Sequence, residues 1–124
     1  MAASCNDDML DAALDEYALS NLMVACSAEP TTRTEAVTTY ALADVAMTPG
    51  TDYTKANGDT SGRKSTTAAK SLVTVDTTGT ANHVAKVDGT RLIYVTTCTA
   101  QALTAGNTVS FPAHDVEIAD PTAV

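Results

Sequence analysis

Residues 80–97, TANHVAKVDGTRLIYVTT, decide the fold because they contain two runs of alternating residues joined by a turn sequence. Asp88 and Gly89 lie between the runs. An Asp-Gly pair in this setting is a strong signal for a β-hairpin, since both central residues of the favoured turn adopt positive φ. We therefore expect two paired antiparallel strands at this point of the chain.

The second run, 91–97, has large residues on both of its faces. Leu92 and Tyr94 would share one face of a regular strand, and Ile93 and Val95 would share the other. This pattern is typical of a strand inside a sandwich and not of a solvent-faced edge.

The residues around this hairpin continue the β pattern. Short apolar runs occur at 72–75, 108–113 and 116–118, with a turn signal at 105–107. Pro112 interrupts the last pair of runs and predicts a bulge or an edge there. Strands spaced by turns about every ten residues predict a mainly β fold, a small antiparallel β-sandwich or barrel.

The N-terminal part predicts one α-helix over about 6–20. Asn6 or Ser4 can cap it, and acidic residues follow in its first turn, where the helix dipole favours them. The expected apolar stripe consists of Met9, Ala13, Leu14 and Tyr17.

Residues 22–26 (LMVAC) predict a buried strand, and 38–47 are ambiguous, with a strand favoured near 40–42. No internal repeat or linker divides the sequence, so we expect one domain over 1–124.

Residues 49–67 form the least core-like stretch of the chain, with turn signals, mixed charge and no large aliphatic side chain. We expect a long polar arm here. Long excursions of this kind are functional or mobile, and both interpretations stay open: a contact arm ordered by assembly, or mobile surface.

The composition argues for a thin core in an acidic protein. The chain has 22 Ala and 22 Thr but one Phe and no Trp, and its net charge is −8. Few side chains bring the large buried area that aromatic residues supply, so we expect partner chains to contribute to stability. The negative charge argues against binding to nucleic acid or to anionic membranes. No apolar run is long enough to span a bilayer.

The cysteines do not form a metal or redox motif. Cys5, Cys26 and Cys98 lack paired C-x-x-C spacing. Cys26 and Cys98 lie in or beside apolar runs, so we expect both to be small buried residues. Cys5 lies in a polar segment and could link neighbouring subunits in an oxidising environment.

Candidate catalytic groups are few. His83 has no Ser-His-Asp or Cys-His grouping in view, which favours a structural or surface role. His114 would lie on the opposite strand face from Asp115 and Glu117, so the three do not predict a single metal site. Residues 58–65, GDTSGRKS, do not match the spacing of a phosphate-binding loop. We expect no enzyme activity, no cofactor and no metal.

Several segments together resemble small virion proteins of tailed bacteriophages. The similarity is carried by residues 26–30 (CSAEP), 61–64 (SGRK), 78–85 (TGTANHVA) and 103–109 (LTAGNTV). The resemblance implies a non-enzymatic capsid decoration or cement protein that bridges capsomers of the major capsid protein. It also implies a homotrimer on the capsid surface, assembled in the cytoplasm of a bacterial host.

Two other virion roles stay open. One is a tail fibre or receptor-binding module, and the other is a neck or tail adaptor. In each case we expect partner contacts at the N-terminal segment, the polar arm and the C-terminal tail. The candidate contact residues are Cys5, Tyr53 in its loop, Arg63, Lys64, Asp120 and Val124.

Overall fold

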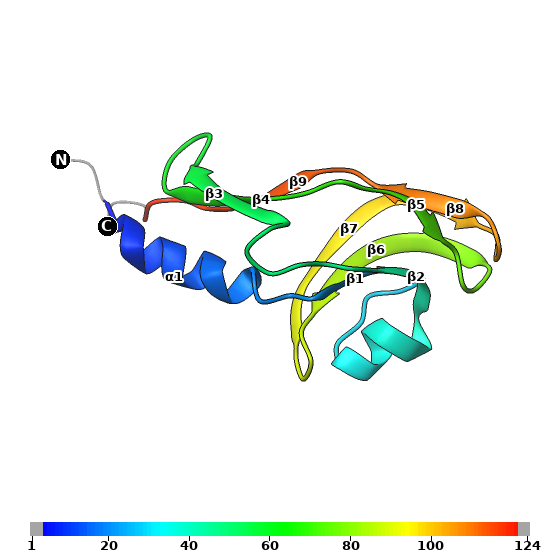
Figure 1. Cartoon of the computed structure of the whole chain (residues 1–124). Coiled ribbons are helices and arrows are strands. Elements are labelled where there is room, and N and C mark those ends of the chain that lie inside the picture. The colour runs from blue at the N-terminus through cyan, green and yellow to red at the C-terminus, as the bar shows by residue number, and fades with distance from the viewer. Residues whose placement is uncertain (1–3, 122–124) are drawn as a thin grey trace.

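The computed structural model describes residues 4–121, which form one α-helix, one π-helical turn and nine strands (Figure 1). In chain order these elements are α1 (Asp7–Tyr17), β1 (Leu22–Cys26), η1 (Glu35–Thr39), β2 (Ala41–Ala46), β3 (Tyr53–Asn57), β4 (Arg63–Thr67), β5 (Lys70–Thr74), β6 (Gly79–Val87), β7 (Leu92–Leu103), β8 (Thr108–Phe111) and β9 (His114–Ile118).

The strands pair antiparallel in three sheets, ordered β2-β1-β6-β7, β3-β4-β9 and β5-β8. Residues 63–74 form β4 and then β5, and residues 108–118 form β8 and then β9. Each of these stretches therefore has one strand in the second sheet and one in the third. An isolated bridge between Ala43 and Val75 joins this ribbon to β2. The predicted mainly β fold is confirmed as a small antiparallel β-sandwich with one N-terminal helix; the sheets do not close into a barrel.

Helix α1 begins where the sequence predicts. Asn6 is the N-cap, and its side-chain oxygen accepts a hydrogen bond of 2.8 Å from the Asp8 amide. The buried face consists of Leu10, Leu14 and Tyr17. The prediction that Met9 belongs to the apolar stripe was wrong, because this side chain is 63% exposed and Leu10 takes its place.

The hairpin of β6 and β7 is confirmed, but its turn differs from the expected one. In residues 4–121, neither Asp88 nor Gly89 has positive φ. Instead, the Asp88 carboxylate accepts hydrogen bonds from the Thr90 and Arg91 amides, at 2.8 and 2.6 Å. The Asp88 amide also donates to the Arg91 carbonyl at 3.1 Å, so side chain and backbone close this turn together without the positive φ that Asp-Gly predicts.

Strand β7 differs from the prediction in position and register. It lies at the edge of its sheet, so the expectation of an interior strand was wrong. The register shifts between Lys86, which pairs with Tyr94, and Val87, which pairs with Leu92. This β-bulge leaves one extra residue in β7 and places Leu92 and Tyr94 against different core clusters.

The polar arm expected over 49–67 is largely ordered. It contains β3 and β4, which pair with each other, while β4 also pairs with β9. Polar residues form these strands because one face of the small sheet is exposed while Ser65 and Thr67 face inward and are buried. Pro112 lies between β8 and β9, where the chain changes sheet, so its missing N–H removes no ladder bond.

The core occupies both faces of the four-stranded sheet. The larger cluster lies between this sheet, helix α1 and the other sheets, and includes Tyr17, Met23, Tyr53 and Phe111. The smaller cluster lies under the π-helical turn and includes Val24 and Cys26. In the described part of the chain, no helix is both long and apolar enough to cross a membrane.

Candidate functional site

The open side of the sandwich lies between β7 and the stretch formed by β8 and β9. We call this region the seam. Strand β7 ends one sheet, β8 and β9 end the other two, and no strand pairing joins them within residues 4–121. The side chains along the seam surround three hollows.

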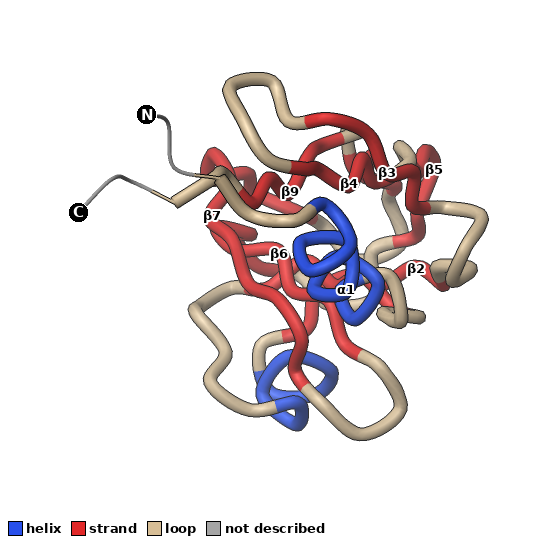
Figure 2. The backbone as a smooth tube through the Cα atoms, turned by 90° about the vertical axis from the view of Figure 1, so that its left-hand side faces the viewer, coloured by secondary structure: helices blue, strands red, loops and turns tan. Residues whose placement is uncertain are grey.

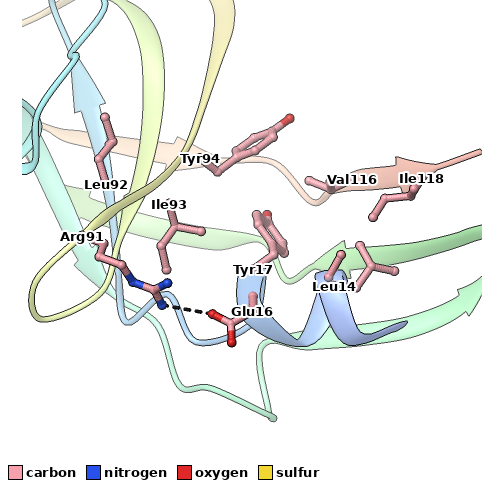
Figure 3. Close-up of a pocket in the computed structure, with 10 residues that line it drawn as sticks. Leu14, Glu16, Tyr17, Arg91, Leu92, Ile93, Tyr94, Val116 and Ile118 are labelled. Atoms are coloured by element: carbon pink, nitrogen blue, oxygen red, sulfur yellow. Dashed lines mark hydrogen bonds and ion pairs between the residues drawn. The ribbon is translucent and has the colours of Figure 1, made fainter. Parts of the chain in front are cut away.

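The first hollow lies where α1 meets the start of β7 and the end of β9 (Figure 3). It has a volume of about 350 Å³ and is lined mainly by apolar side chains, with Tyr17 and Tyr94 at its inner end. At its rim Arg91 Nη2 lies 3.2 Å from Glu16 Oε2. This ion pair is the charged part of a lining that is otherwise apolar and aromatic.

The other two hollows continue along the seam toward β8. The second, of about 210 Å³, lies between residues 96–98 and 111–115. The third, of about 250 Å³, is lined by Cys98, Gln101 and Leu103 on β7 and by Val109 and Phe111 on β8. The edge of β7 is therefore bordered by unfilled space over most of its length.

Lys86 lies beneath the seam and is the largest fully buried side chain of the described residues. Its Nζ lies 5.3 Å from the ring centre of Tyr17 and 5.1 Å from that of Tyr94, so the amine contacts two aromatic faces. Lys86 Nζ also donates a hydrogen bond to His114 Nε2. His114 Nδ1 donates to the Pro112 carbonyl at 2.9 Å, which leaves Nε2 as the acceptor.

Burial controls the protonation of this pair. It lowers the pKa of Lys86 from its ordinary 10.5 to about 7, because removal from water penalises the charged amine. Burial also lowers the pKa of His114, against the effect of the hydrogen bond to Pro112. None of the ion pairs within residues 4–121 includes Lys86.

The tyrosines beside Lys86 form a polar and aromatic cluster. Tyr17 packs edge-on against Tyr53 and Tyr94, with ring centres 5.3 Å apart in both pairs. The Tyr17 hydroxyl lies 2.6 Å from Thr67 Oγ1, and the Tyr53 hydroxyl donates to the Ser20 carbonyl at 3.0 Å. Burial raises the pKa of both phenols. These hydrogen bonds fix the orientation of the Tyr17 and Tyr53 rings, and Tyr17 is one of the two rings that contact Lys86.

The candidate contact residues on the arm have partners within the chain. Arg63 Nε lies 2.8 Å from Asp11 Oδ1, and Lys64 Nζ lies 2.8 Å from Asp59 Oδ1. Tyr53 is only 6% exposed and begins strand β3, so its predicted place in a loop was wrong. Its ring belongs to the core.

The terminal candidates lie apart from the seam. Cys5 is half-buried, and its thiol contacts the Met9 sulfur at 3.9 Å. The Asp120 amide donates to Ser61 Oγ at 3.0 Å. Val124 lies outside the described residues. The structure does not bring the candidate contact residues together into one surface.

Of the two cysteines that we expected to be buried, one is buried and the other is exposed. Cys26 is buried, as expected, and burial raises its pKa to about 11. The expectation that Cys98 is buried was wrong, because β7 continues past the hairpin and carries this thiol to its exposed half.

His114, Asp115 and Glu117 do not converge. Asp115 accepts from Thr66 Oγ1 at 2.7 Å, Glu117 accepts from the Asp59 amide, and His114 points to Lys86. Within residues 4–121, no group of three His, Cys, Asp or Glu side chains is placed to hold a metal.

Lys86 is the central polar residue of this region, and it was not among the residues predicted from the sequence. Its signal was the run HVAKV at 83–87, where a lysine stands at an inward position between small apolar residues. Alternation places Lys86 on the same face as Val84, and the register places Tyr94 opposite it.

Comparison with known proteins finds no family model, no curated protein and no solved structure that matches this chain. The resemblance to phage virion proteins therefore stays a prediction.

Proposed function

We propose that the chain is a non-enzymatic structural protein that binds the capsid surface of a tailed bacteriophage as a decoration protein. The observation that carries this proposal is the seam, where three hollows open to the surface beside an uncharged strand edge that pairs with no second strand in residues 4–121. Open strand edges of this length are normally covered or protected in proteins that act alone.

The thin core supports the same conclusion. Alanine supplies several of the buried positions, and the largest fully buried side chain is a lysine. Burial of such a core contributes less free energy of folding than burial of a core rich in leucine and aromatic residues. Contacts with neighbouring chains would therefore add to the stability. A lattice of capsid proteins would supply them in the bacterial cytoplasm, where the particle assembles.

The copy number in purified particles tests this proposal. Virions of the phage that encodes the chain would be digested and quantified by mass spectrometry with labelled peptides, using the major capsid protein as the internal standard. We expect hundreds of copies per particle, because a decoration protein follows the symmetry of the shell.

Other outcomes would overturn the proposal. A dozen copies or fewer would place the chain at the neck or tail. Labelling by antibody at fibre tips would favour the receptor-binding role. Absence from the particle would remove the chain from the virion.

A further inference from the structure

Strand β7 has a free edge that is long and uncharged. Its twelve residues, LIYVTTCTAQAL, contain no acidic or basic side chain and no proline. Only β6 pairs with it among the described elements, and Figure 2 shows β7 at one margin of the molecule. The outer edge of β7 thus presents backbone N–H and C=O groups available to another strand.

The second half of β7 is exposed on both faces. Residues 97–102, TCTAQA, are all exposed, although consecutive side chains of a strand point to opposite sides. Small, uncharged residues on both faces allow a second sheet edge to approach without a steric or charged barrier.

The other strand edges carry the usual protections. Strand β2 is shorter, contains Asp44 and is bridged to Val75. Strand β3 carries Lys55, and β9 carries Asp115 and Glu117. Charged residues and short length are the common means by which proteins prevent edge pairing. Strand β7 differs from these edges in lacking both, and its own irregularities are two register shifts in its pairing with β6.

An uncharged strand can pair with its own copy, because self-pairing brings no like charges opposite one another. Two copies with a net charge of −8 each repel one another over most of their surfaces. The neutral strip of β7 allows their approach at the lowest electrostatic cost. A strand paired with its own copy in antiparallel orientation also satisfies a twofold axis, the commonest symmetry of soluble oligomers.

We propose that β7 is a self-association site, at which two copies pair their β7 edges antiparallel about a twofold axis near Thr97 and Cys98. The pairing joins the two four-stranded sheets into one continuous sheet. This inference gives the β7 edge to a second copy and leaves the hollows beside β8 and β9 to the capsid contact of the proposed function. It differs from the cyclic homotrimer that the phage resemblance implies.

Sedimentation equilibrium and native mass spectrometry of the full chain test this site. We expect a dimer at about 50 µM, a concentration at which interfaces of micromolar affinity are occupied. Thr99→Lys places a charge in the exposed half of β7 and should weaken association at least tenfold. Thr38→Lys is the matched control, because Thr38 is an exposed threonine of the π-helical turn, away from β7; it should leave the dimer unchanged.

A second variant separates loss of pairing from loss of folding. Gln101→Glu is isosteric at an exposed position and adds one negative charge to an acidic chain. It should also produce monomers whose urea unfolding curve matches that of the wild type.

Alkylation of Cys98 gives an independent readout. The exposed Cys98 thiol should react with iodoacetamide several-fold more slowly as the wild-type concentration rises, whereas Cys5 should react at a constant rate. In Thr99→Lys the Cys98 rate should not depend on concentration.

A monomer at about 50 µM would overturn the inference. A trimer that Thr99→Lys leaves intact would also overturn it. Neither result would affect the capsid proposal, which depends on the copy number in particles.

Discussion

At the scale of single residues, the molecule is unusual in using a lysine as an interior side chain. Lys86 lies where an inward-facing aliphatic residue would be ordinary, and two tyrosine rings and His114 replace the water that its amine loses. Because Lys86 is buried without a carboxylate partner, the neutral amine is favoured, and the pKa falls to about 7. This residue makes the stability of the protein depend on pH in the neutral range.

The free energy of unfolding should rise with pH from about 7 toward 10.5. In this window the unfolded chain binds a proton at Lys86 that the folded chain does not, and the slope approaches about 1.4 kcal/mol per pH unit. Below pH 7 both states bind the proton, so Lys86 adds no further dependence. Urea unfolding at pH 7.0, 7.5 and 8.0 measures the slope, and comparison with Lys86→Met separates it from the opposing effect of cysteine thiols that begin to ionise in the unfolded chain.

The matched variants are Lys86→Met and Lys55→Met. Lys86→Met should remove the slope, because methionine has similar length and no titrating group. Lys55 is an exposed lysine of β3, so Lys55→Met should keep the slope of the wild type. An equal slope in all three proteins would show that Lys86 stays charged in the folded state.

At the scale of secondary-structure elements, helix α1 is held to the sheets by its cap, its apolar face and ion pairs. Asp11 binds Arg63 of β4, Asp15 binds Lys55 of β3, and Glu16 binds Arg91 before β7. These three acidic residues therefore bridge α1 to neighbouring elements.

Asn6→Ala should lower the free energy of unfolding by about 1 kcal/mol, because the Asp8 amide loses its acceptor at the helix start. Ser4→Ala is the control, since Ser4 is the other cap that the sequence allows and it does not cap the helix in the structure. It should change the unfolding free energy by less than about 0.5 kcal/mol. Equal effects of the two substitutions in urea unfolding would contradict the assignment of the cap.

Elements specified by local signals could be predicted from the sequence, and elements specified by distant pairing could not. The Asn6 cap, the buried strand at Leu22–Cys26 and the β6–β7 hairpin follow from residues next to one another. Strand β7 continues to Leu103 because residues 101–103 pair with 79–81, a contact that alternation alone does not reveal.

The same limit applies to the candidate contact residues. Arg63 and Lys64 looked free for a partner, but the carboxylates that bind them include Asp11 and Asp115, about fifty residues away in sequence. A double change of Arg63 and Lys64 to Glu would therefore disturb the fold as well as any contact with a capsid.

At the scale of the whole molecule, an acidic surface surrounds one neutral edge. The net charge of −8 is spread over helix α1, the loops and β9, whereas β7 carries no charge. Repulsion between copies and attraction along β7 therefore oppose each other, and the balance depends on ionic strength.

Raising sodium chloride from 0.01 to 0.15 M should strengthen self-association several-fold. The Debye length falls from about 30 to about 8 Å over this range, which screens the repulsion between two acidic chains. Sedimentation equilibrium measures the effect. Weaker association at higher salt would instead indicate that opposite charges hold the copies together.

The order of strands in the main sheet also determines when the chain can fold during its synthesis. Strand β1 is central, and its Cys26 pairs with His83 of β6; Thr67 of β4 pairs with His114 of β9. At about 5–20 residues per second, the ribosome needs about 3–12 s to make the residues between β1 and its second neighbour. The nascent chain thus carries a half-paired apolar strand for seconds, and β4 gains its second partner only once the residues of β9 have been made.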